Sequence, residues 1–159
     1  MTKNEFWSEF ISPLPNAILK KYPNGNIMQF WADSPALYSG YFGKTNEMGK
    51  FLCGHSAIDI QTHEGDPVLA AHDGWVSQIL YNAPTGGNVV YVKSPNFDDK
   101  GKKYYCVTTY AHLKEVRVKK DSFVFKGECL GLEGNTGFVV SGGVAYWGNA
   151  PAGKGVHLH

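Results

Sequence analysis

The sequence predicts an all-β domain over residues 50–159, built mainly from antiparallel strands, after an arm at residues 1–49 that is irregular or partly helical. Three observations predict this fold. From Cys53 onward, short runs rich in β-branched and aromatic residues alternate with turn residues. No ten-residue stretch of that region has the apolar spacing of a helix. The chain also contains 19 glycines, and glycine-rich turns are typical of short-stranded β domains.

The arm is the least regular part of the chain. Apolar residues between Phe6 and Lys21 roughly follow a helical stripe, but Pro13 and Pro15 interrupt it. The stretch 27–42 is dense in aromatic residues and contains turn signals. We expect the arm to pack against the rim of the β domain. An alternative is that its aromatic side chains line a substrate cleft.

Seven or eight strands are expected in the β domain, which would form a sheet with its site along one open face or groove. The expected segments are 57–61, 68–71, 75–80, 88–93, 104–112, 116–118, 122–125 and 129–133. His72-Asp73-Gly74 is read as a hairpin turn. Residues 94–102 are expected to form a polar loop and residues 137–157 a longer loop that bears aromatic side chains.

Composition limits the possible functions. With 43% hydrophobic and 14% aromatic residues, the chain can form one domain with a substantial core. The net charge of +1 gives no reason to expect nucleic acid or an anionic membrane as a partner. The apolar runs are too short to span a bilayer, and residues 1–20 lack the apolar core of a signal peptide. Three cysteines cannot form a closed disulfide set; Cys106 and Cys129 are expected as structural strand residues, with Cys53 a minor alternative as a metal ligand.

Two pairs of residues have the spacing of metal ligands. In an extended strand, His157 and His159 project from one face and Leu158 from the other. His55 and Asp59 are four residues apart and also share a side, whether the backbone is extended or helical. Neutral imidazole and carboxylate both bind zinc, and catalytic zinc sites use three protein ligands. The spacing predicts a zinc site of these two residues and one terminal histidine; a solvated tail is the alternative for the terminal pair.

The spare terminal histidine is a natural acid, base or oxyanion stabiliser. His112 lies at an expected strand end on the same face as Tyr110 and is a candidate for the same role. Other polar residues are expected to be solvated turn residues or surface charges: His63, His72, Glu128 and Glu133.

Four motifs occur in order: His55-x-x-x-Asp59, Tyr110-Ala111-His112-Leu113, Gly134-Asn135-Thr136-Gly137 and His157-Leu158-His159. Together they resemble the lysostaphin/LytM-type zinc endopeptidases that cut peptidoglycan cross-bridges, and Gly65 to Val76 is similar to that family's scaffold. The resemblance covers about residues 50 to 159. It implies Zn²⁺ held by His55, Asp59 and His159, with His112 and His157 as the catalytic pair.

The resemblance further implies an antiparallel sheet that forms an open groove and peptidoglycan stems or cross-bridges as the substrate. It also implies an extracytoplasmic, cell-wall-associated or phage-delivered protein, and we expect a monomer. The sequence departs from the family pattern at Ala57, where glycine is usual, and in the aromatic loop, which we expect to shape substrate choice. Family members continue beyond the position of His159, so we expect a truncated C-terminal strand and a weakly held ligand.

Two alternatives belong to other functional classes. One is a catalytically impaired or inactive module of the same fold that binds cell wall or regulates another hydrolase. The other is a swinging-arm carrier domain, because Gly65 to Val76 also resembles the hairpins of lipoyl and biotinyl scaffolds. Such carriers need a lysine at the hairpin tip, where this sequence has His72-Asp73-Gly74, so we set that alternative aside. Glycyl-glycine and D-alanyl-to-diamino-acid bonds both remain open as the bond that is cut.

Overall fold

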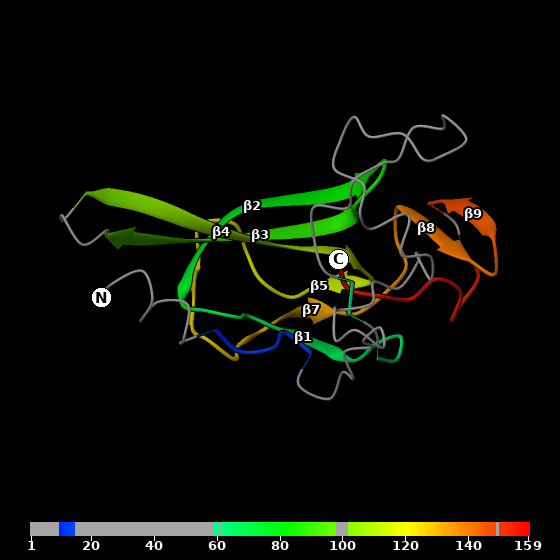
Figure 1. Ribbon diagram of the computed structural model, residues 1–159, viewed down its shortest axis with the longest axis horizontal. Helices are drawn as coiled ribbons and strands as arrows, with labels where there is room; N and C mark the ends of the chain where they lie inside the picture. Colours follow the sequence, from blue (N-terminus) through cyan, green and yellow to red (C-terminus); the bar gives the residue numbers. More distant parts are fainter. Residues whose placement is uncertain (1–9, 15–58, 61, 98–101, 149) are drawn as a thin grey trace, which may run out of the picture.

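The described part of the chain consists of β-strands and connecting loops (Figure 1). The computed structural model describes residues 10–14, 59–60, 62–97, 102–148 and 150–159. Its strands are β1 (Pro67–Leu69), β2 (Gly74–Ala83), β3 (Gly87–Phe97), β4 (Lys103–Leu113), β5 (Glu115–Val116), β6 (Phe123–Val124), β7 (Cys129–Leu132), β8 (Phe138–Ser141) and β9 (Val144–Trp147). All pairings between them are antiparallel, which confirms the predicted all-β fold class for these residues. Within the same ranges no helix is long and apolar enough to cross a membrane.

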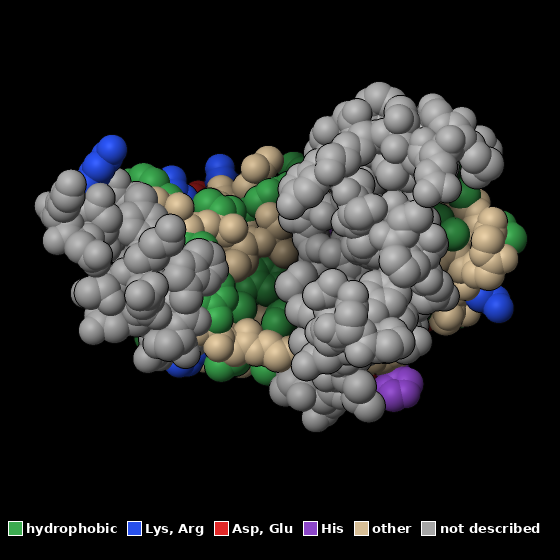
Figure 2. All heavy atoms as spheres, in the orientation of Figure 1, with side chains coloured by type: hydrophobic (Ala, Val, Ile, Leu, Met, Phe, Trp, Pro, Cys, Tyr) green, Lys and Arg blue, Asp and Glu red, His purple; other side chains and the backbone are tan. Residues whose placement is uncertain are grey.

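The strands form two main sheets and a separate hairpin. The larger sheet has the order β4-β3-β2-β6 and the smaller one the order β1-β7-β5, while β8 and β9 form a two-stranded sheet. Figure 1 shows the long strands β2, β3 and β4 above β1 and β7, with the C-terminus between these layers and the β8–β9 hairpin at one end. On the face seen in Figure 2, the described Lys and Arg side chains lie mostly toward the margins, and the described atoms near the centre are hydrophobic or uncharged.

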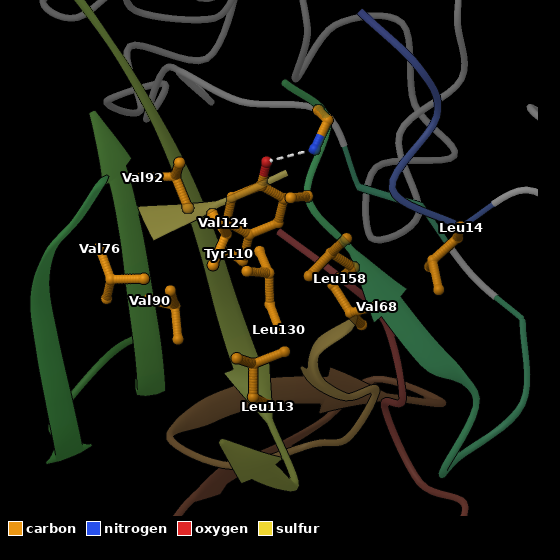
Figure 3. Close-up of a cluster of buried hydrophobic side chains, with 12 residues drawn as sticks. Leu14, Val68, Val76, Val90, Val92, Tyr110, Leu113, Val124, Leu130 and Leu158 are labelled. Atoms are coloured by element: carbon orange, nitrogen blue, oxygen red, sulfur yellow. Dashed lines mark hydrogen bonds between the residues drawn. The ribbon is translucent and has the colours of Figure 1, made fainter. Parts of the chain in front are cut away.

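The core lies between the two main sheets (Figure 3). Alternate residues of β2 and β3, such as Val76, Val90 and Val92, are fully buried and face side chains of the smaller sheet. The Tyr110 hydroxyl accepts a hydrogen bond from the Ala71 amide (2.9 Å), which joins the large sheet to the chain that follows β1. Because its hydroxyl is hydrogen-bonded, this buried tyrosine places no unpaired polar group in the apolar core.

Five residues of the arm are described, and we call residues 10–14 the N-terminal strap. The strap runs beside the end of β1 and the residues that follow it, since the Leu69 amide donates to the Pro13 carbonyl (2.8 Å) and the Ile11 amide donates to the Ala71 carbonyl (3.0 Å). Leu14 is fully buried in the main core. The rest of the arm, with its expected helical pieces and the boundary at residue 50, lies outside the described residues.

The predicted hairpin at His72-Asp73-Gly74 is wrong. β1 pairs with β7, while β2 pairs with β3 and β6, so the turn carries the chain from one sheet to the other. His72 is buried rather than solvated; its Nδ1 donates to the Asp73 carbonyl (2.8 Å) and its Nε2 bonds with the Thr108 hydroxyl (2.9 Å). Burial lowers the pKa of His72. A turn signal fixes a change of direction, and which strands then pair depends on long-range contacts.

Two predicted loops are shorter than expected because strands extend into them. β3 continues to Phe97 and β4 begins at Lys103, so residues 94–97 of the predicted polar loop 94–102 belong to a paired ribbon. The predicted loop 137–157 contains the β8–β9 hairpin. The predicted strand at 57–61 is described only at Asp59 and Ile60. Cys106 and Cys129 lie in β4 and β7 as partly buried free thiols.

The strap should contribute to stability through Leu14. We expect Leu14→Ala to lower the free energy of unfolding by about 2–4 kcal/mol, because it removes a fully buried side chain and leaves a cavity. Ile11→Ala is the matched control in the same strap. Because Ile11 is 37% exposed, this substitution should lower the free energy of unfolding by less than about 1 kcal/mol. Urea denaturation measures both values. Equal midpoints for the two variants would contradict a core role for the strap.

Candidate active site

Four of the five predicted site residues lie together where the C-terminal segment enters between the sheets. The amide of Ile60 donates to the Leu158 carbonyl (2.9 Å) and the Leu158 amide donates to the Ile60 carbonyl (2.7 Å), which sets Asp59 beside the terminal histidines. The Ala111 amide donates to the His159 carbonyl (3.0 Å), which brings the end of β4 to the same place. Leu158 points into the core, as the His-x-His spacing predicts.

Asp59 is the centre of this cluster. Its side chain is fully buried, and its Oδ1 lies 3.1 Å from His159 Nδ1 and 3.9 Å from His157 Nε2. A buried carboxylate requires hydrogen-bond donors or cations around it, and His159 Nδ1 supplies one such donor to Oδ1. His157 is buried as well, whereas the His159 side chain is 31% exposed and reaches the surface.

His112 and His157 are each held by a backbone carbonyl. His112 Nδ1 bonds to the Thr136 carbonyl oxygen at 2.7 Å and His157 Nδ1 bonds to the Gly155 carbonyl oxygen at 2.8 Å. A carbonyl can only accept, so in both rings Nδ1 carries the proton and Nε2 of the neutral ring carries a lone pair. The two ring centroids are 4.5 Å apart. Burial, with His157 close by, lowers the pKa of His112 to about 4.

The backbone of His112 has left-handed geometry, with φ of 61°. A residue with a Cβ adopts this region at a cost of roughly 1–2 kcal/mol, and such residues are often found at functional sites. The conformation is held because the His112 amide donates to the Gly86 carbonyl (2.8 Å). It ends the in-out alternation of β4, because Tyr110, Ala111, His112 and Leu113 are all buried.

The loop Gly134 to Gly137, one of the four sequence motifs, orients both histidines. The Thr136 carbonyl accepts the hydrogen bond from His112 Nδ1, and the Gly134 carbonyl accepts the hydrogen bond from the His157 amide (3.2 Å). The Thr136 hydroxyl donates to the Leu113 carbonyl (2.9 Å), which fastens the loop to the end of β4. A Cβ on Gly134 would lie 2.5 Å from the Lys114 amide nitrogen, so this close approach requires glycine.

Glu133 was predicted to be a surface charge, and that prediction is wrong. Its side chain is 0% exposed, its Oε1 accepts the Thr62 amide (3.2 Å) and its Oε2 accepts the Thr62 hydroxyl. Burial raises the pKa of Glu133. No local pattern signals this, because an acidic residue after a short glycine-containing strand is usually solvated. His63 is solvated as predicted, and Glu128 is exposed as predicted.

Glu64 also joins separate segments near the site. Its Oε1 accepts the Lys114 ammonium (2.9 Å) and its Oε2 accepts the Gly153 amide (2.6 Å). The hydrogen bond from Lys114 is the main cause that lowers the pKa of Glu64. These contacts tie the turn after Asp59 to the end of β4 and to the segment that precedes His157. Sequence reasoning missed this residue, since its partners are distant in sequence.

The donor types in the cluster fit zinc, which binds imidazole nitrogen and carboxylate oxygen. Asp59 and His159 supply these atoms, with 3.1 Å between Asp59 Oδ1 and His159 Nδ1. Within the described ranges, no three His, Cys, Asp or Glu residues are arranged as a metal site. His55, which the resemblance implies as a ligand, lies outside the described residues.

The left-handed backbone of residue 112 predicts an order of stability for two variants. Both His112→Gly and His112→Ala remove the ring, but only the alanine retains a Cβ that opposes the positive φ. We expect the glycine variant to be more stable than the alanine variant by about 1 kcal/mol in urea unfolding. The usual order, with alanine the more stable, would contradict the assigned backbone geometry.

Comparison with known proteins supports a peptidase. The sequence model described as "Peptidase family M23" matches residues 53–159. An uncharacterized metalloprotease of Haemophilus influenzae is 36% identical over 83 residues, which cover 52% of this chain and 16% of that protein. The peptidoglycan DD-endopeptidase ShyA of Vibrio cholerae is 36% identical over 90 residues, which cover 57% of this chain and 19% of that protein. The chain therefore spans less than a fifth of the length of these two relatives.

A solved structure shows the same fold. The catalytic domain of the prophage-encoded M23 protein EnpA from Enterococcus faecalis, solved in a mutant form, matches with a TM-score of 0.51 and 23% identity. The match covers 79% of this chain and 78% of that domain. Since the family's sequence model extends over more than half of the chain, from residue 53 to residue 159, the chain belongs to peptidase family M23.

Proposed function

We propose that this protein is a zinc-dependent endopeptidase that hydrolyses peptide cross-links of bacterial peptidoglycan. The observation that carries the proposal is the buried Asp59 carboxylate surrounded by His112, His157 and His159, which come from two distant parts of an M23 chain. Two similar proteins are named as a metalloprotease and a peptidoglycan DD-endopeptidase, which supports the same activity and substrate class. Such a substrate places the action outside the cytoplasm, in the cell wall or after delivery by a phage.

His55, Asp59 and His159 would hold the zinc in this proposal. When bound, zinc supplies Lewis acidity, which makes water a better nucleophile near neutral pH and polarises the scissile carbonyl. Asp59 is already desolvated and hydrogen-bonded to an imidazole, so its carboxylate is oriented before any ligand arrives. Such preorganisation lowers the reorganisation needed for catalysis.

His112 and His157 would move protons and stabilise charge. Each presents a lone pair at Nε2, because its Nδ1 proton is committed to a backbone carbonyl. One imidazole can take the proton from the attacking water, and the resulting imidazolium can donate it to the leaving amine. The second imidazole lies close enough, at 4.5 Å between ring centroids, to share this role or to stabilise the developing negative charge.

Substitutions should separate the metal ligands from the catalytic pair. We expect Asp59→Ala and His159→Ala to lose the bound zinc and the activity together. His112→Ala and His157→Ala should retain zinc and lose about 10²–10⁴-fold in turnover, the usual contribution of acid-base groups. Elemental analysis measures zinc per chain, and chromatography of muropeptides released from purified sacculi measures turnover.

The exposed His63 provides the control, because His63→Ala should change neither zinc content nor turnover. Chelation of the metal should abolish hydrolysis, and added zinc should restore it. A purified protein without zinc and without hydrolysis of either glycyl-glycine or D-alanyl cross-links would contradict the proposed function. Full turnover by His112→Ala would contradict the role of that residue alone.

The β8–β9 hairpin is well placed to shape substrate choice. Phe138 and Trp147 are cross-strand partners with ring centroids 4.2 Å apart, and Trp147 is 67% exposed. The hairpin starts two residues after Thr136, whose carbonyl orients His112. The Phe138 amide donates to the Thr85 carbonyl (2.8 Å), so the base of the hairpin is fixed to the main sheet. An exposed indole at the base of this hairpin can stack on part of the substrate.

We therefore expect Trp147→Ala to weaken substrate binding without changing the chemistry. KM for soluble cross-linked muropeptides should rise roughly tenfold, which corresponds to about 1.4 kcal/mol, while kcat stays nearly constant. Val144→Ala is the matched control, because Val144 is a similarly exposed residue of the same hairpin. A fall in kcat with KM unchanged would show that Trp147 acts on the catalytic residues and not on the substrate.

A further inference from the structure

Glu133 is a buried carboxylate for which the proposed chemistry has no use. It follows β7 and has no exposed surface, yet both of its oxygens accept hydrogen bonds from Thr62. Burying a carboxylate costs free energy unless it is well bonded, so a purely structural position would be filled more easily by an apolar residue. The contacts of Glu133 with the segment that carries Asp59 suggest what it does.

Three chain segments close a ring of contacts around the site. The segment of Asp59 joins the C-terminal segment through the two hydrogen bonds between Ile60 and Leu158. The C-terminal segment joins the loop after β7 through the hydrogen bond from the His157 amide to the Gly134 carbonyl (3.2 Å). The loop after β7 joins the Asp59 segment through Glu133, the residue next to Gly134. Each of the three contacts therefore involves a residue that is at most three positions from Asp59, His157 or His159 in the sequence.

The side chain of Glu133 contacts the Asp59 segment closer to Asp59 than the backbone of Glu133 does. The backbone of Glu133 also bonds to this segment, but at Gly65 and Asp66, which are six and seven residues beyond Asp59. The carboxylate reaches Thr62, only three residues beyond Asp59. The Ile60 to Leu158 contact is an isolated bridge of two hydrogen bonds, about which a strand can pivot. A second fixed point at Thr62 removes that freedom.

We propose that Glu133 is a positioning residue that, through Thr62, fixes the direction of the Asp59 carboxylate relative to His157 and His159. The consequence for metal binding rests on the proposed function, whereas the consequence for the backbone does not. Polar groups that orient metal ligands from behind typically change metal affinity by about 10–100-fold when they are removed. The same loss is expected here from removing either partner of the contact.

The informative variant is the double substitution Glu133→Leu with Thr62→Val. Replacing both side chains by apolar groups of similar size leaves no buried polar side chain unpaired. The amide of residue 62 loses its Glu133 acceptor, but this residue is only partly buried and its amide can bond to water, so the fold should keep most of its stability. The single variant Glu133→Leu leaves the Thr62 hydroxyl and amide without their acceptor and should be less stable. Glu133→Gln keeps a carbonyl oxygen for Thr62 and should retain most of the positioning. Glu128→Leu is the control, because Glu128 precedes the same strand and is exposed.

The first measurement is amide hydrogen exchange on the full chain as purified, followed at Ile60 and Leu158. We expect the double variant to exchange at these amides at least tenfold faster than the wild type, with unchanged urea stability, and Glu128→Leu to match the wild type. The exchange rates of Glu133→Gln at these two amides should be close to those of the wild type. Unchanged protection in the double variant would overturn the proposal, whether or not the protein binds zinc.

The second measurement is zinc affinity, by competition with a chromophoric chelator. A 10–100-fold loss in the double variant at unchanged stability, with rescue by Glu133→Gln, supports the proposal. Wild-type affinity in the double variant would overturn it, because the Asp59 carboxylate would then be positioned without Glu133. A wild-type protein that binds no zinc would contradict the proposed function, and hydrogen exchange alone would then decide the role of Glu133.

Discussion

Two backbone hydrogen bonds between Ile60 and Leu158 are the constraint on which the rest of the site depends. They join positions almost a hundred residues apart, so they form only when the two main sheets have packed. Leu158 then fills the core between the sheets, and its two histidine neighbours are directed to Asp59. Core packing and site assembly are therefore one event, because the residue between the histidines belongs to the core.

The fold class and the pairing of functional residues were predictable because they follow from periodicity. An even spacing places side chains on one face of an extended chain, so His157 and His159 could be grouped without a structure. The grouping of Asp59 with His112 depended on family resemblance, since nothing in the local sequence brings them together. His55 and most of the arm lie outside the described residues, so the predictions about them are unchanged.

The features that sequence reasoning missed depend on contacts between distant segments. Nothing near Glu133 or His72 in the sequence shows that Thr62 and Thr108 will lie against them. The β8–β9 hairpin was missed because its strands are four residues long and pair with no other strand of the described residues. Polar residues that bury themselves in pairs have no periodic pattern, and each looks like a surface residue until its partner is known.

The orientation of His112 and His157 is set by main-chain carbonyls at Thr136 and Gly155. In many sites an aspartate or asparagine side chain has this task, and one nucleotide change can remove it. Here the acceptor belongs to the peptide backbone, which every amino acid at positions 136 and 155 would provide. The proton arrangement of the two imidazoles is therefore encoded by the path of the chain, so the identities of residues 136 and 155 matter through the loop shape that they hold, by the Thr136 hydroxyl and by the left-handed backbone of Gly155.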